Sequence, residues 1–158
     1  MKNLRVLTDK GTLDIKILKK FEEEFQITLP NLYVELMQKH NGGIFYEDCF
    51  DFIDLEGDVD SSSIAFLGFN VDEGSNIKTF QQQEEEGGYK GIITFGLNGA
   101  GDYICFDYRQ SPTTNNPPIV FMLHDDCIED EYGNEKMVVM KVTDNFENFI
   151  KNLYEDTE

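Results

Sequence analysis

Four consecutive residues of the chain are of types that bind metal ions: His124, Asp125, Asp126 and Cys127. Zinc and related ions need ligands that converge on one point. Side chains of adjacent residues leave an extended segment in different directions, so these four cannot close one tetrahedral site. We therefore expect no metal here, and no other segment suggests a cofactor.

A second acidic segment imitates the start of a calcium-binding loop. Asp58, Asp60 and Ser62 alternate as the first ligands of such a loop do. However, Ser63 stands where the loop needs a glycine, and Phe69 stands where it needs a bidentate glutamate. This pattern predicts an acidic turn.

Three glycines, Gly96, Gly99 and Gly101, suggest a phosphate-binding loop. No Lys-Ser or Lys-Thr pair follows them, and the next element has the sequence of a strand, whereas a phosphate loop leads into a helix N-terminus. A hairpin turn explains the glycines better, because glycine tolerates the positive φ that such turns need.

Nucleophilic catalysis needs a nucleophile, a base and a group that orients the base. The three cysteines and two histidines show no such grouping, and the Gly-x-Ser-x-Gly motif is absent. With 31 acidic residues in the chain, many carboxylates lie near another by chance. We expect no catalytic residue and no enzymatic activity.

The charge of the chain restricts its partners. Thirty-one Asp and Glu residues against 13 Lys and Arg give a net charge of −18, which repels phosphate backbones and anionic lipid heads. We expect no nucleic-acid partner and no membrane association. The same charge favours fast association with a basic protein, although it could also serve solubility alone.

Length and cysteine content indicate one cytoplasmic domain. A chain of 158 residues has the usual size of a domain with a single core, so we expect one domain over residues 1–158 and favour a monomer. Three cysteines at no metal-ligand spacing are typical of reduced thiols in the cytosol. No apolar run approaches the roughly 18 residues that span a bilayer, and the N-terminus does not resemble a signal peptide.

Two helices are predicted in the first quarter of the chain. Residues 14–25 carry one apolar stripe, with Asp14 as the expected N-cap. Pro30 suits the first turn of the second helix. That helix should end at Asn41–Gly43, since Asn and Gly accept the left-handed conformation of a helix C-terminus.

Two further helices are expected later in the chain. A short one should cover residues 76–83. The last should cover residues 144–154, with Asp144 as its cap and Glu147 as the capping-box partner. Its apolar residues recur at helical spacing, which predicts one buried stripe.

The remaining patterned segments are typical of antiparallel strands, being short and rich in aromatic and β-branched residues. They span residues 44–46, 50–55, 64–69, 91–97, 102–108, 119–123 and 137–142. An acidic loop should join the last two. Separate helices and strands predict an α+β fold, in which an antiparallel twisted sheet packs against N-terminal, middle and C-terminal helices.

Two acidic tracts are the candidate partner-binding surface. The first runs from Glu47 to Asp60 without a Lys or Arg, and the second from Asp125 to Glu131. Aromatic residues interleave with both, and aromatic anchors surrounded by charge are typical of interfaces. Alternatively, the aromatic residues belong to the core and the acids are only hydrated, and the sequence does not decide between these interpretations.

Four segments of the chain resemble the signatures of the SUKH superfamily, which includes the fungal Smi/Knr cell-wall assembly regulators. Together, in this order, they cover nearly the whole chain: Phe21-Glu22 through Leu29-Pro30-Asn31-Leu32-Tyr33 with Asn41-Gly42-Gly43; Ile93 through Asp102 with Tyr103, Cys105, Phe106 and Asp107; Pro118-Ile119-Val120-Phe121 with His124-Asp125; and Phe146 through Ile150. The family signature mostly marks the fold, so we expect these residues to be fold determinants: Leu29, Pro30, Tyr33, Asn41, Gly42, Gly43, Phe95, Gly96, Asn98, Gly99, Gly101 and Asp102.

The resemblance implies an α+β fold, no catalytic activity and, for bacterial members, a common role as immunity proteins. Such proteins bind and neutralise a polymorphic toxin, often a nuclease domain. Fungal members act as intracellular signalling scaffolds with disordered extensions around the domain. The sequence has no such extensions, so we expect the bacterial role.

Charge and resemblance together predict one mechanism. A nuclease presents a basic surface to phosphates, and an acidic protein can occupy that surface. The expected partner is a cognate toxin with a basic nuclease domain. The expected contact residues are Tyr46, Asp48, Asp51, Asp54, Glu56, Asp58, Asp125, Asp126, Glu129, Asp130, Glu131 and Tyr132. A regulatory scaffold of the Smi/Knr type and a small-ligand binding module stay open as alternatives.

Overall fold

In the computed structural model, which describes residues 3–156, the first two helices lie where the apolar spacing predicts them. The first helix, α1, spans Ile15–Phe25 and begins at Asp14, whose carboxylate accepts a hydrogen bond of 2.9 Å from the backbone N–H of Lys16. The second helix, α2, spans Asn31–Lys39. Pro30 is the N-cap of α2 and so precedes the first turn in which it was expected.

The last helix, α3, spans Phe146–Asn152 and corrects the predicted cap. Asn145 accepts a hydrogen bond of 2.8 Å from the backbone N–H of Asn148. Asp144 instead forms an exposed ion pair of 3.2 Å with Lys141. Asn and Asp cap helices about equally well, so residue type does not separate these two neighbours.

The predicted middle helix is shorter than expected and consists of 3₁₀ turns. Its central turn, η2, covers Ile77–Phe80, with η1 over Glu73–Ser75 before it and η3 over Glu84–Glu86 after it. No helix among residues 3–156 is both long and apolar enough to cross a lipid bilayer.

The central sheet contains five antiparallel strands in the order β5-β6-β7-β8-β9. They span Ala65–Phe66, Ile92–Leu97, Tyr103–Asp107, Ile119–Glu129 and Glu135–Thr143, so β5 covers only part of the strand predicted over residues 64–69. The hairpin predicted around Asn98 is confirmed, since Leu97 lies opposite Tyr103. The predicted α+β fold class is confirmed as well.

The far end of this sheet overturns the expected acidic loop. Residues 124–129 continue β8, and Cys127 lies opposite Met137, after an irregular stretch of pairing between Met122 and Cys127. A ribbon that leaves the body is wet on both faces, so its sequence lacks the apolar alternation by which strands are recognised. The β8–β9 pair is therefore a long hairpin.

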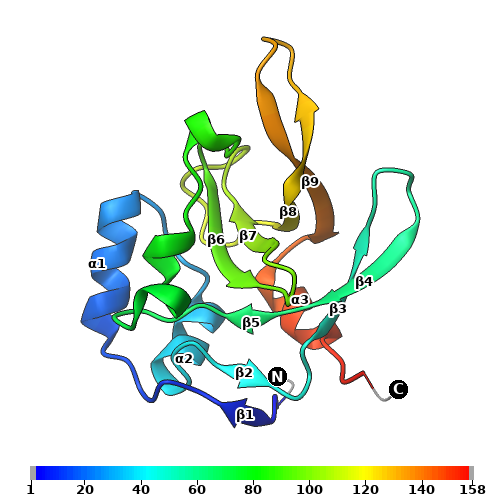
Figure 1. The fold of residues 1–158 in the computed structure, drawn as a ribbon. Coiled ribbons are helices and arrows are strands. Elements are labelled where there is room, and N and C mark those ends of the chain that lie inside the picture. Colours follow the sequence, from blue (N-terminus) through cyan, green and yellow to red (C-terminus); the bar gives the residue numbers. More distant parts are fainter. Residues whose placement is uncertain (1–2, 157–158) are drawn as a thin grey trace.

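Two small sheets complete the fold. β1, Val6–Thr8, pairs with β2, Ile44–Phe45, and β3, Cys49–Ile53, pairs with β4, Val59–Ser63. Neither β1 nor β4 was predicted. In Figure 1 the β3–β4 and β8–β9 hairpins both extend beyond the body of the molecule, and their tips lie well apart.

The sheet buries both faces by different means. One face packs against the helices through a core that includes the rings of Tyr33, Phe95, Phe106 and Phe146. The other face carries a smaller cluster of Ile92, Cys105, Val120, Met122 and Met137.

Hydrogen bonds tie the connection between η2 and β6 to the sheet. The side chain of Gln81 accepts a hydrogen bond from the N–H of Thr94 and donates one to its carbonyl, and the N–H of Met137 donates to the carbonyl of Gly87.

Candidate functional site

The first acidic tract folds into the β3–β4 hairpin, residues 49–63, which we call the first acidic hairpin. Asp54 shapes its turn, because one carboxylate oxygen accepts hydrogen bonds of 2.9 Å from the backbone N–H groups of Glu56 and Asp58. Gly57 follows with φ of +87°. Such an Asx turn, followed by a glycine in the left-handed region, fixes the direction of the hairpin.

The second acidic tract forms the outer part of the β8–β9 hairpin, residues 124–136, which we call the second acidic hairpin. Its turn repeats the first one atom for atom. Asp130 accepts hydrogen bonds of 2.9 Å from the backbone N–H groups of Tyr132 and Asn134, and Gly133 has φ of +81°.

The hairpin between β6 and β7 contains the same turn a third time. The side-chain oxygen of Asn98 accepts hydrogen bonds of 3.0 Å and 2.8 Å from the N–H groups of Ala100 and Asp102, and Gly101 has φ of +85°. All three turns share one sequence pattern: Asp or Asn, then any two residues, then Gly, then Asp or Asn. Only the turn around Asn98 was predicted from the sequence.

The two acidic hairpins are joined at their bases. Phe50 and Phe52 of β3 pack on Phe121 of β8, with ring centroids 5.5 Å and 4.8 Å apart. Phe50 also contacts Phe149 of α3. These buried contacts root both hairpins in one core while their tips project into solvent.

The structure shows which aromatic residues in and just before the first tract belong to the core. Phe45, Phe50 and Phe52 are buried in the core. Tyr46 is 45% exposed but lies beside Arg5, whose guanidinium is 5.3 Å from its ring centroid, and it is outside the first acidic hairpin. Only Tyr132 is an aromatic residue at a hairpin tip, and it is 80% exposed.

Most of the predicted carboxylates lie on the hairpins and are exposed to solvent. Asp51 accepts a hydrogen bond of 2.7 Å from the hydroxyl of Tyr154. Asp48 is half-buried just before β3, next to the thiol of Cys49. Asp54 and Asp130 are half-buried in their turns, and the exposed members are Asp51, Glu56, Asp58, Asp125, Asp126, Glu129 and Glu131.

Glu47, at the start of the first tract, has a structural role. It forms an ion pair of 2.6 Å with Arg5, and it also accepts a hydrogen bond of 2.7 Å from the backbone N–H of Arg5. That backbone bond is the main reason that the pKa of Glu47 lies below its usual range. Glu47 therefore ties the N-terminal segment to the core and is not available to a partner.

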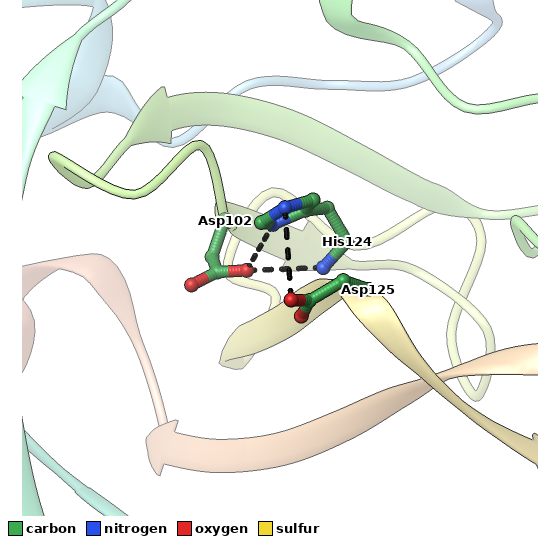
Figure 2. Close-up of side chains that lie close together, drawn as sticks. All are labelled: Asp102, His124 and Asp125. Carbon is green, nitrogen blue, oxygen red and sulfur yellow. Dashed lines mark hydrogen bonds and ion pairs between the residues drawn. The ribbon is translucent and has the colours of Figure 1, made fainter.

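A cluster that sequence reasoning did not find lies at the base of the second acidic hairpin. Figure 2 shows Asp102 directed at His124, with Asp125 beside it. One oxygen of Asp102 bonds both the ring Nδ1 of His124 at 2.6 Å and its backbone N–H at 3.0 Å. The other accepts a hydrogen bond of 3.1 Å from Asn98. Asp102 thus connects the β6–β7 turn to the irregular part of β8.

The charges of this pair reinforce each other. The hydrogen bond to Asp102 raises the pKa of His124. Burial alone would raise the pKa of Asp102, but the hydrogen bonds from His124 and Asn98 outweigh it and lower that pKa. Asp125 is a looser neighbour, 4.0 Å from Nε2 of His124.

Within residues 3–156, two groups of side chains are close enough to hold a cation: Asp102, His124 and Asp125, and Asp54, Glu56 and Asp58. Each group has a structural explanation. In the first, Nδ1 of His124 and both oxygens of Asp102 are engaged in hydrogen bonds. In the second, one oxygen of Asp54 holds the turn.

Two of the three cysteines, Cys49 and Cys105, lack the features of nucleophiles. The Cys105 thiol is buried beside the Thr94 hydroxyl at 3.4 Å, and burial raises its pKa to about 12. Burial also raises the pKa of Cys49. Since the thiolate is the reactive form, neither thiol is activated.

The fold and surface define an α+β domain with two acidic hairpins, on which carboxylates and apolar side chains are exposed together. The chain belongs to the SMI1/KNR4 family (SUKH-1), whose model matches residues 12–152. This family generally comprises non-catalytic immunity and regulatory proteins and includes toxin immunity proteins. Comparison with curated proteins gives no match, and comparison with solved structures gives none.

Proposed function

We propose that this protein is an immunity protein that binds and neutralises a cognate toxin domain, a basic nuclease. The observation that carries the proposal is the arrangement of the two acidic tracts. They lie far apart in the sequence, yet they form two hairpins that share a base and expose their carboxylates. Membership of a family that includes toxin immunity proteins supports the same function.

The physical basis is electrostatic complementarity. A nuclease surface that holds phosphates is positive, and the hairpins offer a fixed negative counterpart. Opposite charges raise the rate of encounter, and this effect weakens as salt is added. Neutralisation then needs only that the bound protein covers the catalytic site or its approach.

Co-expression tests this function. The partner to test is the C-terminal domain of any toxin-like protein that a gene beside this one encodes, and the absence of such a gene favours the scaffold function. We expect restored growth of the host and a complex that co-purifies. Failure of both growth rescue and co-purification contradicts the proposal.

Charge-removing variants test the surface. Asp54→Asn, Asp58→Asn and Asp130→Asn keep the turns, because Asn98 and Asn134 already occupy the equivalent positions in this chain. The triple variant should slow association several-fold and reduce its salt dependence. The matched control replaces three exposed acids elsewhere, Glu23, Glu35 and Glu73, by Gln, and should change association much less.

The family also includes regulatory proteins, and a regulatory scaffold of the Smi/Knr type is the second candidate function. It predicts that a non-toxin partner co-purifies and that co-expression gives no protection from a toxin. A small-ligand binding module predicts a saturable thermal shift with a metabolite.

A further inference from the structure

Exposed apolar side chains are concentrated on the two acidic hairpins. Of the nine large apolar residues that are exposed among residues 3–156, five lie there: Ile53, Leu55, Val59, Ile128 and Tyr132. Leu55 is 65% exposed, Val59 67% and Tyr132 80%. Single exposed apolar residues need no explanation, but a concentration on projecting elements does.

Ile53 and Val59 lie opposite each other across β3 and β4, and such a cross-strand pair adds to the stability of the first acidic hairpin. Neither stability nor solubility accounts for Leu55 and Tyr132 in the turns. Each turn has two positions between its Asp and its Gly, and one of them is apolar: Leu55 in the first and Tyr132 in the second. The turn geometry does not restrict these positions to apolar residues. A hairpin that served only to keep the protein soluble would have polar residues at these positions. Charged rims around apolar centres are instead characteristic of protein–protein interfaces.

The shapes of both tips are fixed before any partner arrives. In each tip an Asp side chain closes the turn through two backbone N–H groups, and a glycine with positive φ completes it. Residues held in one conformation lose less entropy on binding. The tips are therefore suited to act as anchors.

Charge selects the kind of partner. Residues 49–63 and 124–136 contain eleven Asp and Glu residues and, besides His124, one basic side chain, Lys136. The amine of Lys136 is bonded to the carbonyls of Glu84 and Gly88. A second copy of this chain would bring the same negative charge and be repelled, whereas a basic protein surface would be attracted.

We propose that the two acidic hairpins grip one basic protein together, with Leu55 and Val59 on the first and Ile128 and Tyr132 on the second as apolar anchors inside a rim of carboxylates. This inference rests on the proposed function, because it takes the partner to be the basic toxin domain. The carboxylates govern how fast the complex forms, and the apolar tips govern how long it lasts.

The test is a set of binding kinetics in which the immobilised probe is the toxin domain used in the co-expression experiment. One variant carries Leu55→Ser and Val59→Thr, a second carries Ile128→Thr and Tyr132→Ser, and a third combines all four. Each pair should raise the dissociation rate by about tenfold, and the combination by about a hundredfold or more, with association changed by less than about twofold. The control Leu7→Ser removes an apolar side chain that is 56% exposed on β1, far from the tips, and should have no effect.

The outcomes separate this inference from the function beneath it. If the charge variant slows association but the apolar variants dissociate at the wild-type rate, the apolar residues are not anchors and this inference is wrong. Recognition of a basic partner by the carboxylates is then still supported. Sensitivity of only one hairpin also overturns the joint grip. If the wild-type protein does not bind the toxin domain at all, the proposed function fails and the grip fails with it.

Two further measurements check that the variants are folded and that the free protein is a monomer. Circular dichroism and thermal unfolding should stay close to the wild type for every variant, because the altered side chains are exposed and Val59→Thr keeps a β-branched residue opposite Ile53. Sedimentation velocity of the free protein should give a monomer. A dimer that disappears in the four-residue variant would show that the tips bind a second copy of this chain, and would overturn the proposal.

Discussion

The β6–β7 hairpin and the two acidic hairpins use one turn for opposite purposes. All three turns have the same side-chain and backbone hydrogen bonds and the same left-handed glycine. The strands flanking Asn98 are buried on both faces of the sheet, whereas β4 after Asp54 and the outer part of β8 before Asp130 are largely exposed and only one face of β3 is buried. Turn chemistry therefore sets the shape of a hairpin, and its flanking residues decide whether it supports the core or meets solvent and partners.

The last residue of the turn makes the difference concrete. Asp58, Asn134 and Asp102 occupy the same position. Asp58 and Asn134 are exposed, while Asp102 is only 8% exposed and joins the β6–β7 turn to His124. The same turn position therefore makes a tertiary contact in the β6–β7 hairpin and is exposed to solvent in the two acidic hairpins.

Replacing this residue should give the largest separation between the hairpins. Asp102→Ala removes a buried acceptor of three hydrogen bonds and leaves the backbone N–H of His124 without its partner. We expect a loss of about 2–4 kcal/mol in the free energy of unfolding. Asp58→Ala on the first acidic hairpin should change it by less than about 0.5 kcal/mol. Urea denaturation of both variants measures the difference, and equal losses would contradict the comparison.

A smaller effect is expected from the glycines. Gly101 and Gly57 both have positive φ, and an added Cβ would meet nothing within 4 Å at either site, so backbone conformation alone is tested. Gly101→Ala should destabilise the protein by about 1–2 kcal/mol. Gly57→Ala should lower the global free energy of unfolding less, because a projecting hairpin can open locally.

The β6–β7 turn supplies its own control for this prediction. Gly99 lies in the same turn, has no positive φ and also has open space around it. Gly99→Ala should therefore leave the free energy of unfolding nearly unchanged. A loss as large as that of Gly101→Ala would show that the turn rejects any side chain and that φ is not the cause.

The contrast between the hairpins also explains what the sequence could predict. Asn98 to Gly101 stand between apolar strands, so turn and strands supported one another and the hairpin was predicted. β3 before Asp54 alternates buried phenylalanines with exposed residues and was predicted, whereas β4 and the outer part of β8 are polar and were missed although their turns carry the same pattern. A hydrated ribbon has local turn chemistry but no period-2 apolar pattern.

The cluster of Asp102 and His124 illustrates a second limit. The two residues are 22 positions apart, and they meet only because Tyr103 lies opposite Met122 in the sheet and the pairing becomes irregular after Met122. Strand register cannot be read from one sequence when the pattern is interrupted. The acidic tracts could be found by composition, but which of their aromatic residues are buried depends on the same tertiary packing.

The third prediction concerns pH and carries the smallest effect. His124 faces two carboxylates, Asp102 at 2.6 Å and Asp125 at 4.0 Å. Its pKa is raised above the ordinary histidine value of about 6.5, chiefly by the hydrogen bond to Asp102. The folded protein therefore holds this proton more tightly than the unfolded chain does. The resulting stabilisation is complete below about pH 6.5 and is lost as pH rises through the raised pKa.

Thermal unfolding from pH 6 to pH 8.5 tests this, with His124→Gln as the comparison. Glutamine can still donate a hydrogen bond to Asp102 but does not titrate, so the wild-type Tm should fall more steeply with pH than that of the variant. The other histidine, His40, is paired with Asp9 in both proteins and cancels in the comparison. Equal slopes would mean that the Asp102–His124 contact holds the base of the second acidic hairpin by geometry alone, without a contribution from charge. A steeper wild-type slope would instead show that protonation strengthens the base on which this hairpin stands, while the turns at both tips, closed by backbone N–H donors that do not titrate, keep their shape across the same range.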